Sequence, residues 1–149
     1  MSPSNGMSVT FTSKVKTAME NIDRAQKKRA TEAGIRGRRA VVEKLTGTRT
    51  GREYTVPGTN VTYRASAAGR PGEPPAVRTG ALRGSIAYET ESTIGGYNAI
   101  IGSPKEYAPA LEFGALLWHG GEILPRPFMR PALAEIQGEL MSIMSGRWF

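Results

Sequence analysis

The longest regular pattern of apolar and polar positions runs from about Ser13 to Leu45 and predicts a helix. Apolar side chains recur there at three- and four-residue steps, at Val15, Ala18, Met19, Ile22, Ala25, Ala33, Ala40, Val41 and Leu45. Ser13 suits the N-cap position. At about 1.5 Å per residue, such a helix is roughly 45–50 Å long. Residues 1–12 are expected to be a flexible or extended lead-in.

Ala and Gly make up much of the apolar side of this helix, which favours close packing against another backbone. Gly34 and Gly37 lie near its middle, where glycine lowers helix propensity. They predict a kink, a break or a close crossing with another element.

Residues 46–80 have the composition of loops and short strands. Tyr54–Val56 and Val61–Arg64 are expected to be two short strands around the turn dipeptide Pro57-Gly58. Residues 67–78 contain too much Gly and Pro for the interior of a helix or strand. They are expected to form a long exposed arm, because loops of this length are usually functional or disordered.

Shorter elements are expected beyond this arm. Thr79 suits the cap of a helical turn over residues 79–83. The other expected elements are a β-hairpin made of Ser85–Glu91 and Tyr97–Gly102, a third strand or short helix over Tyr107–Phe113, and an apolar loop over Gly114–Leu124 that contains Trp118 and His119.

The last pattern is again helical. Residues 125–131 hold three prolines and form a rigid lead into it, with Pro131 suited to the first turn. Its buried side is expected to carry Leu133, Ile136, Leu140 and Met144. The fold class is therefore α+β in one domain over residues 1–149: a long N-terminal helix, a small antiparallel sheet with an extended Pro/Gly-rich arm, and a C-terminal helix packed on the sheet.

Charge is distributed unevenly. The net charge is +7, and residues 1–52 hold 12 Lys/Arg against 4 Asp/Glu, whereas residues 53–149 hold 8 against 9. The helix contributes a basic series: Arg24, Lys27, Lys28, Arg29, Arg36, Arg38 and Arg39. This series indicates a face for DNA or for an acidic protein, although an exposed helix face is the commoner explanation. No aromatic residue interleaves with these charges, which disfavours specific binding of single strands.

Catalytic chemistry is not indicated. The chain has no cysteine and one histidine, so thiolate and multi-histidine metal sites are excluded. His119 and Glu122 have a spacing seen in metal motifs, but two residues in a Gly-rich loop are better explained as solvated. No phosphate loop, dinucleotide fingerprint or nucleophile elbow occurs. We therefore expect no enzyme and no cofactor. A small enzyme such as a nuclease is the third hypothesis. It would need clustered carboxylates or histidines, and the sequence offers none.

No apolar run is long enough to cross a membrane, and residues 1–6 lack the apolar stretch of a secretory signal. The chain is expected to be made in a cytoplasm, without a membrane partner.

Two apolar groups are candidates for subunit contacts. The first is dense and comprises Tyr107, Leu111, Phe113, Leu116, Leu117 and Trp118. Most of it is expected to be core, but Trp118 stands beside Gly120-Gly121 in a loop, where aromatic residues often anchor interfaces. The second comprises Met141, Met144, Trp148 and Phe149. A monomer rarely exposes so much apolar surface, which favours an oligomer.

Three segments, in order, resemble one known family. They are residues 69–86 (GRPGEPPAVRTGALRGSI), residues 106–114 (EYAPALEFG) and residues 124–133 (LPRPFMRPAL). Together they cover about 37 of 149 residues. Their order is similar to that in the HK97 gp10-like family of phage neck and tail-completion proteins. Ala115 departs from the threonine that the family often has after Glu-Phe-Gly, and residues 115–124 have a sequence of their own.

The resemblance implies a structural protein of a tailed-phage virion, located at the head–tail junction and present in the host cytoplasm during assembly. It implies a homo-oligomeric ring, six-fold favoured over twelve-fold, without catalysis. The implied partners are connector or stopper proteins, the tail tube or terminator, and the packaged DNA in a non-specific way. The alternative is a nucleic-acid-binding module that uses the basic helix over residues 24–39.

The resemblance also suggests roles for individual residues. Pro71, Pro74 and Pro75 would form an interlocking arm, since proline lowers the cost of ordering a loop. Trp118, Trp148 and Phe149 would anchor subunit contacts. The structural residues of the motifs would be Thr79, Gly80, Leu82, Tyr107, Glu112, Phe113, Gly114, Pro127, Phe128 and Pro131. Glu112 is expected to accept hydrogen bonds from backbone groups or from Arg126 or Arg130.

Overall fold

One unbroken helix dominates the molecule. The computed structural model describes residues 5–65 and 72–146, and α1 occupies Asn5–Thr46. Its 42 residues correspond to a length of about 63 Å. The helix begins at Asn5, so the prediction of a flexible lead-in over residues 5–12 with an N-cap at Ser13 is wrong. No proline interrupts residues 5–46, and the helix continues through the segment that was expected to be irregular.

A β-hairpin packs along the second half of α1. It consists of β3 (Ala87–Thr93) and β4 (Gly96–Gly102), as expected from the sequence, with Glu89 opposite Ile100 in register. Of the three expectations for Gly34 and Gly37, the close crossing is confirmed. A Cβ atom at Gly34 would lie 2.5 Å from Cδ2 of Tyr88 on β3, and one at Gly37 would lie 2.4 Å from Cδ1 of Ile101 on β4. The glycines allow the hairpin to lie directly on the helix.

The C-terminal helical segment also packs on α1. It is two helices, α4 (Met129–Glu135) and α5 (Gln137–Met144), with Ile136 between them. Both lie against α1, whereas the sequence suggested one helix on the sheet. Ion pairs join α1 to both helices: Nε of Arg36 lies 2.6 Å from Glu139 on α5, and Lys44 pairs with Glu135 on α4.

The core is small and lies where these elements meet at the C-terminal half of α1. Its largest fully buried side chains are Phe128, Leu45, Ile86 and Val41. Ala40, Ala108, Ala132 and Ile136 complete the cluster. Of the side chains expected on the buried side of the last helix, Ile136 is buried, Leu133 and Leu140 pack at the edge of the core, and Met144 is exposed.

Short elements cover the end of the molecule near the C-terminus of α1. β1 (Glu53–Thr55) and β2 (Thr62–Arg64) form the small hairpin expected there, and α2 spans Ala81–Ser85. Residues 107–113 were left open between strand and helix, and α3 (Ala108–Phe113) is a helix. The apolar loop expected over residues 114–124 contains a third hairpin, β5 (Ala115–Leu116) with β6 (Glu122–Ile123). Within residues 5–65 and 72–146, the strands therefore form three separate two-stranded sheets.

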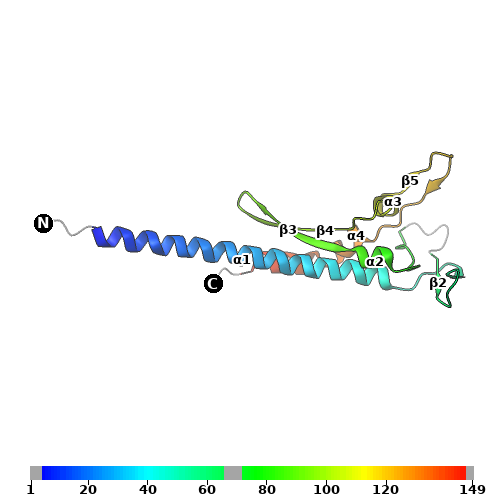
Figure 1. Ribbon diagram of the computed structural model, residues 1–149, viewed down its shortest axis with the longest axis horizontal. Helices are drawn as coiled ribbons and strands as arrows, with labels where there is room; N and C mark the ends of the chain where they lie inside the picture. The colour runs from blue at the N-terminus through cyan, green and yellow to red at the C-terminus, as the bar shows by residue number, and fades with distance from the viewer. Residues whose placement is uncertain (1–4, 66–71, 147–149) are drawn as a thin grey trace.

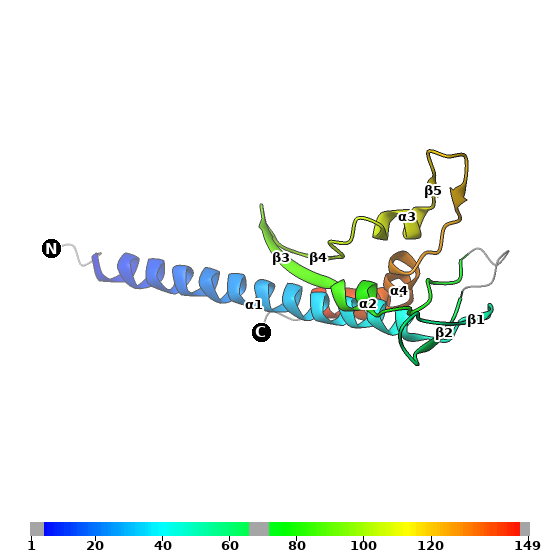
Figure 2. The same ribbon diagram turned by 45° about the vertical axis from the view of Figure 1, so that its right-hand side comes forward.

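The molecule is elongated, with one projection at each end. The N-terminal part of α1 extends well beyond the tip of the β3–β4 hairpin, and the β5–β6 hairpin rises from the opposite end (Figures 1 and 2). Every side chain over residues 14–24 is exposed. We call this segment the rod. None of the helices in the described ranges is long and apolar enough to cross a membrane.

Candidate assembly interface

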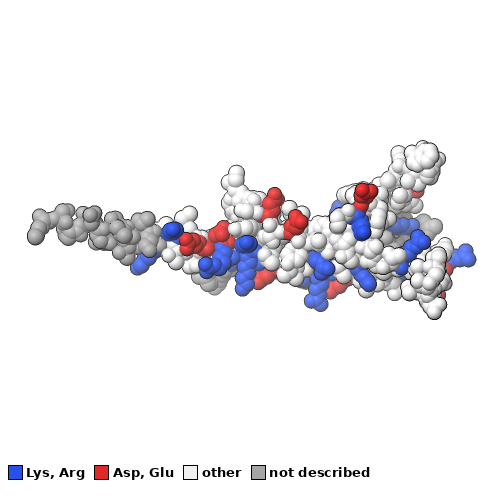
Figure 3. Space-filling view, in the orientation of Figure 1, with Lys and Arg blue, Asp and Glu red and all other residues white. Residues whose placement is uncertain are grey.

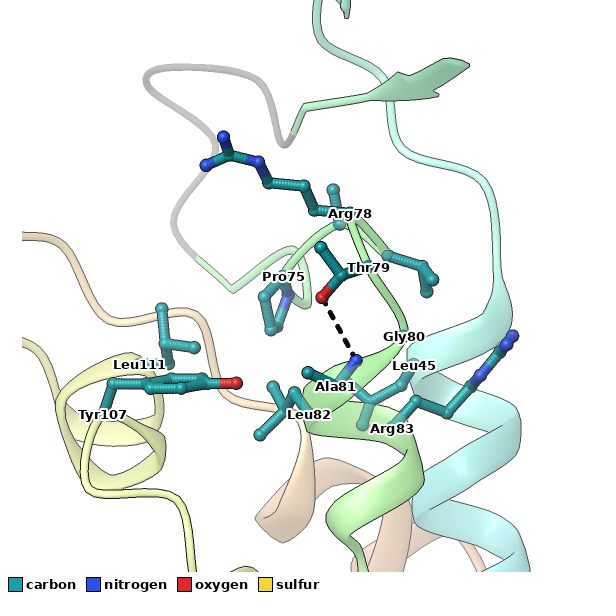
Figure 4. Close-up of a pocket in the computed structure, with 12 residues that line it drawn as sticks. Leu45, Pro75, Arg78, Thr79, Gly80, Ala81, Leu82, Arg83, Tyr107 and Leu111 are labelled. Atoms are coloured by element: carbon teal, nitrogen blue, oxygen red, sulfur yellow. Dashed lines mark hydrogen bonds between the residues drawn. The ribbon is translucent and has the colours of Figure 1, made fainter. Parts of the chain in front are cut away.

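Residues from the first two resembling segments line one groove. The groove has a volume of about 390 Å³ and lies between residues 75–83 and α3. Tyr107 and Leu111 form one side, and Pro75 and Leu82 face them from the other (Figure 4). Segments that are separated in sequence by more than twenty residues therefore meet here through apolar side chains.

Thr79 and Gly80 shape the turn that leads into this groove. Gly80 has a φ of 76°, a left-handed conformation that favours glycine. The hydroxyl of Thr79 accepts a hydrogen bond of 3.3 Å from the backbone N–H of Ala81, the first residue of α2 (Figure 4). The N-cap residue of α2 is Gly80, without a side-chain cap hydrogen bond, so the prediction of Thr79 as the cap is wrong.

Glu112 joins the second resembling segment to the third. Its buried carboxylate on α3 accepts hydrogen bonds from the backbone N–H groups of Phe128 (2.8 Å), Met129 (3.0 Å) and Arg130 (3.0 Å). Nε of Arg130 donates a fourth, of 3.2 Å. The first N–H groups of a helix have no partners within the helix and carry a partial positive charge, so a carboxylate is well suited to them.

These contacts confirm the expectation for Glu112 and select Arg130 from its two possible side-chain partners. Arg126 contributes instead through its backbone N–H, which donates to the carbonyl of Leu111. Burial by itself would raise the pKa of Glu112. The three backbone N–H groups and the guanidinium of Arg130 act more strongly in the other direction, so that the pKa lies below its ordinary value of 4.5. The carboxylate is therefore charged at neutral pH.

Other residues of the second and third segments surround this contact. A Cβ atom at Gly114, whose φ is 79°, would lie 2.8 Å from the carbonyl oxygen of Ile123, so only glycine fits there. The guanidinium of Arg130 lies 4.7 Å from the ring centre of Phe113, which is exposed. Phe128 is fully buried in the core, Pro127 is half-buried before it, and Pro131 lies in the first turn of α4 as expected.

The second half of the expected arm is bound to its own chain. Pro75 is buried and its carbonyl oxygen accepts hydrogen bonds of 3.2 Å from Nε and Nη2 of Arg49. Glu73 accepts hydrogen bonds from the backbone N–H and the hydroxyl of Thr50. Residues 72–78 are therefore not the freely exposed arm that the sequence suggested, because polar contacts hold them against the end of α1. Pro74 is half-buried there, and Pro71 lies outside the described residues.

Arg49 itself was not expected to matter. Its buried guanidinium also donates to the carbonyl groups of Lys44 and Leu45, at 3.0 and 3.4 Å, and to that of Gly47 at 2.7 Å. It thereby satisfies the carbonyl groups left without partners at the C-terminus of α1, where a cation is favoured. The sequence feature that could have indicated this role is a basic residue three positions beyond the end of the helix.

Trp118 lies at the tip of the β5–β6 hairpin and is 94% exposed. Leu116 on the same hairpin is also strongly exposed, and within the described residues the ring of Trp118 lies edge-on to that of His119, its sequence neighbour. The position fits the expectation of an interface anchor, because a large apolar group held in water favours a partner. Met141 and Met144 are exposed too, whereas Trp148 and Phe149 lie outside the described residues.

Several of the basic residues of α1 contact groups of their own chain, and their role as a binding face stays a prediction. Arg36 pairs with Glu139 on α5, Arg38 donates to the carbonyl of Ile86, and Arg39 pairs with Glu43. Arg29 is half-buried beside Gly146, and Lys28 lies 4.0 Å from Glu32. Arg24 at the end of the rod and Lys27 one turn further along α1 are both exposed. Positive groups are interspersed with negative ones along the helix in Figure 3.

Metal-ligating side chains do not cluster in the part of the chain that the structure covers. Within residues 5–65 and 72–146, no three His, Asp or Glu side chains come together in a way that could hold a metal ion. His119 and Glu122 stand on the exposed β5–β6 hairpin. Comparisons with protein-family models, curated proteins and solved structures find no match for this chain.

Proposed function

We propose that this protein is a structural subunit of a tailed-phage particle, a ring-forming neck or tail-completion protein at the head–tail junction. The observation that carries the proposal is the meeting of the three resembling segments in space. The first and second line one groove beside α3, and the second and third are joined through Glu112. Residues that the resemblance selects by sequence alone therefore take part in one structural unit.

The shape of the molecule supports the same proposal. Two apolar surfaces lie uncovered at opposite ends, one on the rod and one on the β5–β6 hairpin. A subunit with two different exposed surfaces can contact a different neighbour through each of them, as ring and stack assembly requires.

The alternative, a nucleic-acid-binding module, has less support. Of the seven basic residues expected on its binding face, three donate hydrogen bonds to groups of their own chain. Fewer free cations remain to neutralise phosphates, which weakens any salt-dependent binding of duplex DNA.

The proposal is tested in a tailed phage that carries this gene, by replacing one early codon with a stop codon. The expected result is an accumulation of DNA-filled heads and separate tails in electron micrographs of infected cells. Supplying the wild-type protein from a plasmid restores joined particles and serves as the control. Normal joined particles without the protein, or a loss of heads, would contradict a role at the junction.

A further inference from the structure

The rod carries an apolar stripe that none of the described residues of its own chain covers fully. Val15, Met19 and Ile22 are 45%, 66% and 41% exposed. They follow each other at four- and three-residue steps and so lie on one side of the helix. Ala33 and Ala40, two and three heptads after Met19, continue this side and are buried in the body.

The reason for this difference is the length of the hairpin. The β3–β4 hairpin covers this side of α1 only as far as Asp23, whose carboxylate accepts a hydrogen bond of 3.1 Å from the hydroxyl of Tyr97. Beyond that point the helix continues and its covering element does not (Figure 2). The uncovered stripe therefore has the character of a packing surface without its partner.

The charges beside the stripe indicate what the partner is like. Lys14 and Lys16 are the neighbours of Val15, and at about 100° per residue they lie on either side of the stripe. Residues 14–28 hold five Lys/Arg against two Asp/Glu. An apolar strip between cations fits a surface that has an apolar centre with carboxylates close to it.

The outer face of the β3–β4 hairpin is such a surface. Tyr88 and Ile101 point to α1, so the alternate residues Ala87, Glu89, Glu91, Asn98 and Ile100 point away from it. Ile100 is 47% exposed and lies opposite Glu89 in register. Residues 87–102 contain two glutamates and no Lys, Arg or His. Carboxylates are visible on this side of the hairpin in Figure 3, away from the cations along α1.

We infer that the rod of one copy docks on the outer face of the β3–β4 hairpin of a second copy, with the apolar stripe over Ile100 and Lys14 and Lys16 near Glu89 and Glu91. The two surfaces differ, so the contact is head-to-tail and can repeat from copy to copy. A ring forms when the rotations between successive copies add up to a full turn. This inference rests on the proposed ring assembly and names the surfaces that build it.

The absence of cysteine allows a direct test by cross-linking. Met19→Cys, Ile100→Cys and Leu116→Cys are made singly in the full chain, mixed in pairs and treated with a short bis-maleimide. The expected product is a covalent dimer in the mixture of Met19→Cys with Ile100→Cys. A dimer from Met19→Cys alone would mean that rods pair with each other. A product with Leu116→Cys would assign the rod to the β5–β6 hairpin instead, and no product at all would equally overturn the inference.

A charge exchange gives the second readout. E89K/E91K should weaken self-association by at least about ten-fold in sedimentation velocity, because it places like charges together. Adding K14E/K16E to the same chain should restore it. E53K/E106K makes the same change in net charge on other exposed positions and should leave association unchanged. If rings form equally well in E89K/E91K, the inference fails and the proposed function stands, whereas a wild-type protein that never associates contradicts both.

Discussion

Glu112 and Arg49 act in the same way at the residue scale. Each is a buried charged side chain that binds the unpaired backbone groups of a helix end: N–H groups at the start of α4 for Glu112, carbonyl groups at the end of α1 for Arg49. Each also ties together segments far apart in the sequence. In a molecule with a small apolar core, such contacts have a large share in holding the short elements in place.

Replacing Glu112 should therefore destabilise the fold. Glu112→Ala leaves one buried and two partly buried N–H groups without this acceptor and should lower the free energy of unfolding by about 2–4 kcal/mol. Glu112→Gln keeps an acceptor oxygen and should cost less. Urea unfolding followed by circular dichroism measures both, and Glu106→Gln, which changes an exposed glutamate, is the control. Equal stability of wild type and Glu112→Ala would show that the contact does not hold α3 to α4.

The pH dependence of stability follows from the same group. The pKa of Glu112 is lower in the folded protein than its ordinary value of 4.5, so the unfolded chain binds the proton more tightly. The stabilisation is complete above pH 4.5 and is lost as the pH falls through the lower folded value. The stability difference between wild type and Glu112→Gln should therefore shrink below pH 4.5. A difference that stays constant down to pH 2 would contradict the lowered pKa.

At the element scale, the hairpin and α1 approach closely only because of two glycines. Gly34 lies under the ring of Tyr88, with three atoms of that side chain within 3.3 Å of the place where a Cβ would be. Gly37 lies under the end of the Ile101 side chain, which can rotate away more easily than a ring. The two positions should therefore differ in their tolerance of a methyl group.

Gly34→Ala should lower the free energy of unfolding by about 1–3 kcal/mol, in spite of the higher helix propensity of alanine. Gly37→Ala should cost less. Gly138→Ala in α5 is the matched control: nothing lies within 4 Å of the added methyl, so it should stabilise by roughly 0.5–1 kcal/mol. Thermal unfolding of the three variants measures the order of their stabilities. Gly34→Ala as stable as Gly138→Ala would contradict the close crossing.

The regular elements were largely predictable from the sequence because their patterns are local. The periodicity of α1, the turn residues between β3 and β4, and the helical pattern after Pro131 depend on neighbouring residues. The docking of residues 72–78 was not predictable, because it depends on Arg49, more than twenty residues away. The β5–β6 hairpin was missed because strands of two residues show no alternation, and the break at Ile136 because the apolar pattern of Leu133, Ile136 and Leu140 continues through it.

Among the candidate interface residues, the motif residues lie in two contact groups. Thr79 lines the groove with Tyr107 and Leu111, and Glu112 accepts a hydrogen bond from the backbone N–H of Phe128. Five of the seven basic residues are exposed on the side of α1 away from the stripe, namely Arg24, Lys27, Lys28, Arg38 and Arg39. The acidic partner of Arg36, Glu139, comes from an element that a helical pattern cannot place. Helical periodicity therefore identified the stripe but not which part of it the chain would cover.

At the scale of the whole molecule, an elongated body presents uncovered apolar surfaces at both ends. The rod and the β5–β6 hairpin add little to the core of the monomer, since their large side chains are exposed. Large exposed apolar side chains of this kind favour burial against a partner.

Replacing Trp118 should affect assembly without affecting folding, because its side chain is exposed. Trp118→Ala should change the stability of the monomer by no more than about 0.5 kcal/mol, because the side chain is 94% exposed. It should nevertheless reduce joining of heads and tails in the complementation experiment described above. Phe128→Ala, in the core, should instead unfold or strongly destabilise the protein. Full complementation by Trp118→Ala would remove this residue from the set of interface anchors.

The most direct test of the central claim is the mass of the purified protein by light scattering, at low and high salt, with and without duplex DNA. We expect a discrete closed assembly, six copies rather than twelve, whose mass DNA does not change. A monomer or dimer that binds DNA at low salt and releases it at high salt would contradict the ring and make the basic residues of α1 the functional surface.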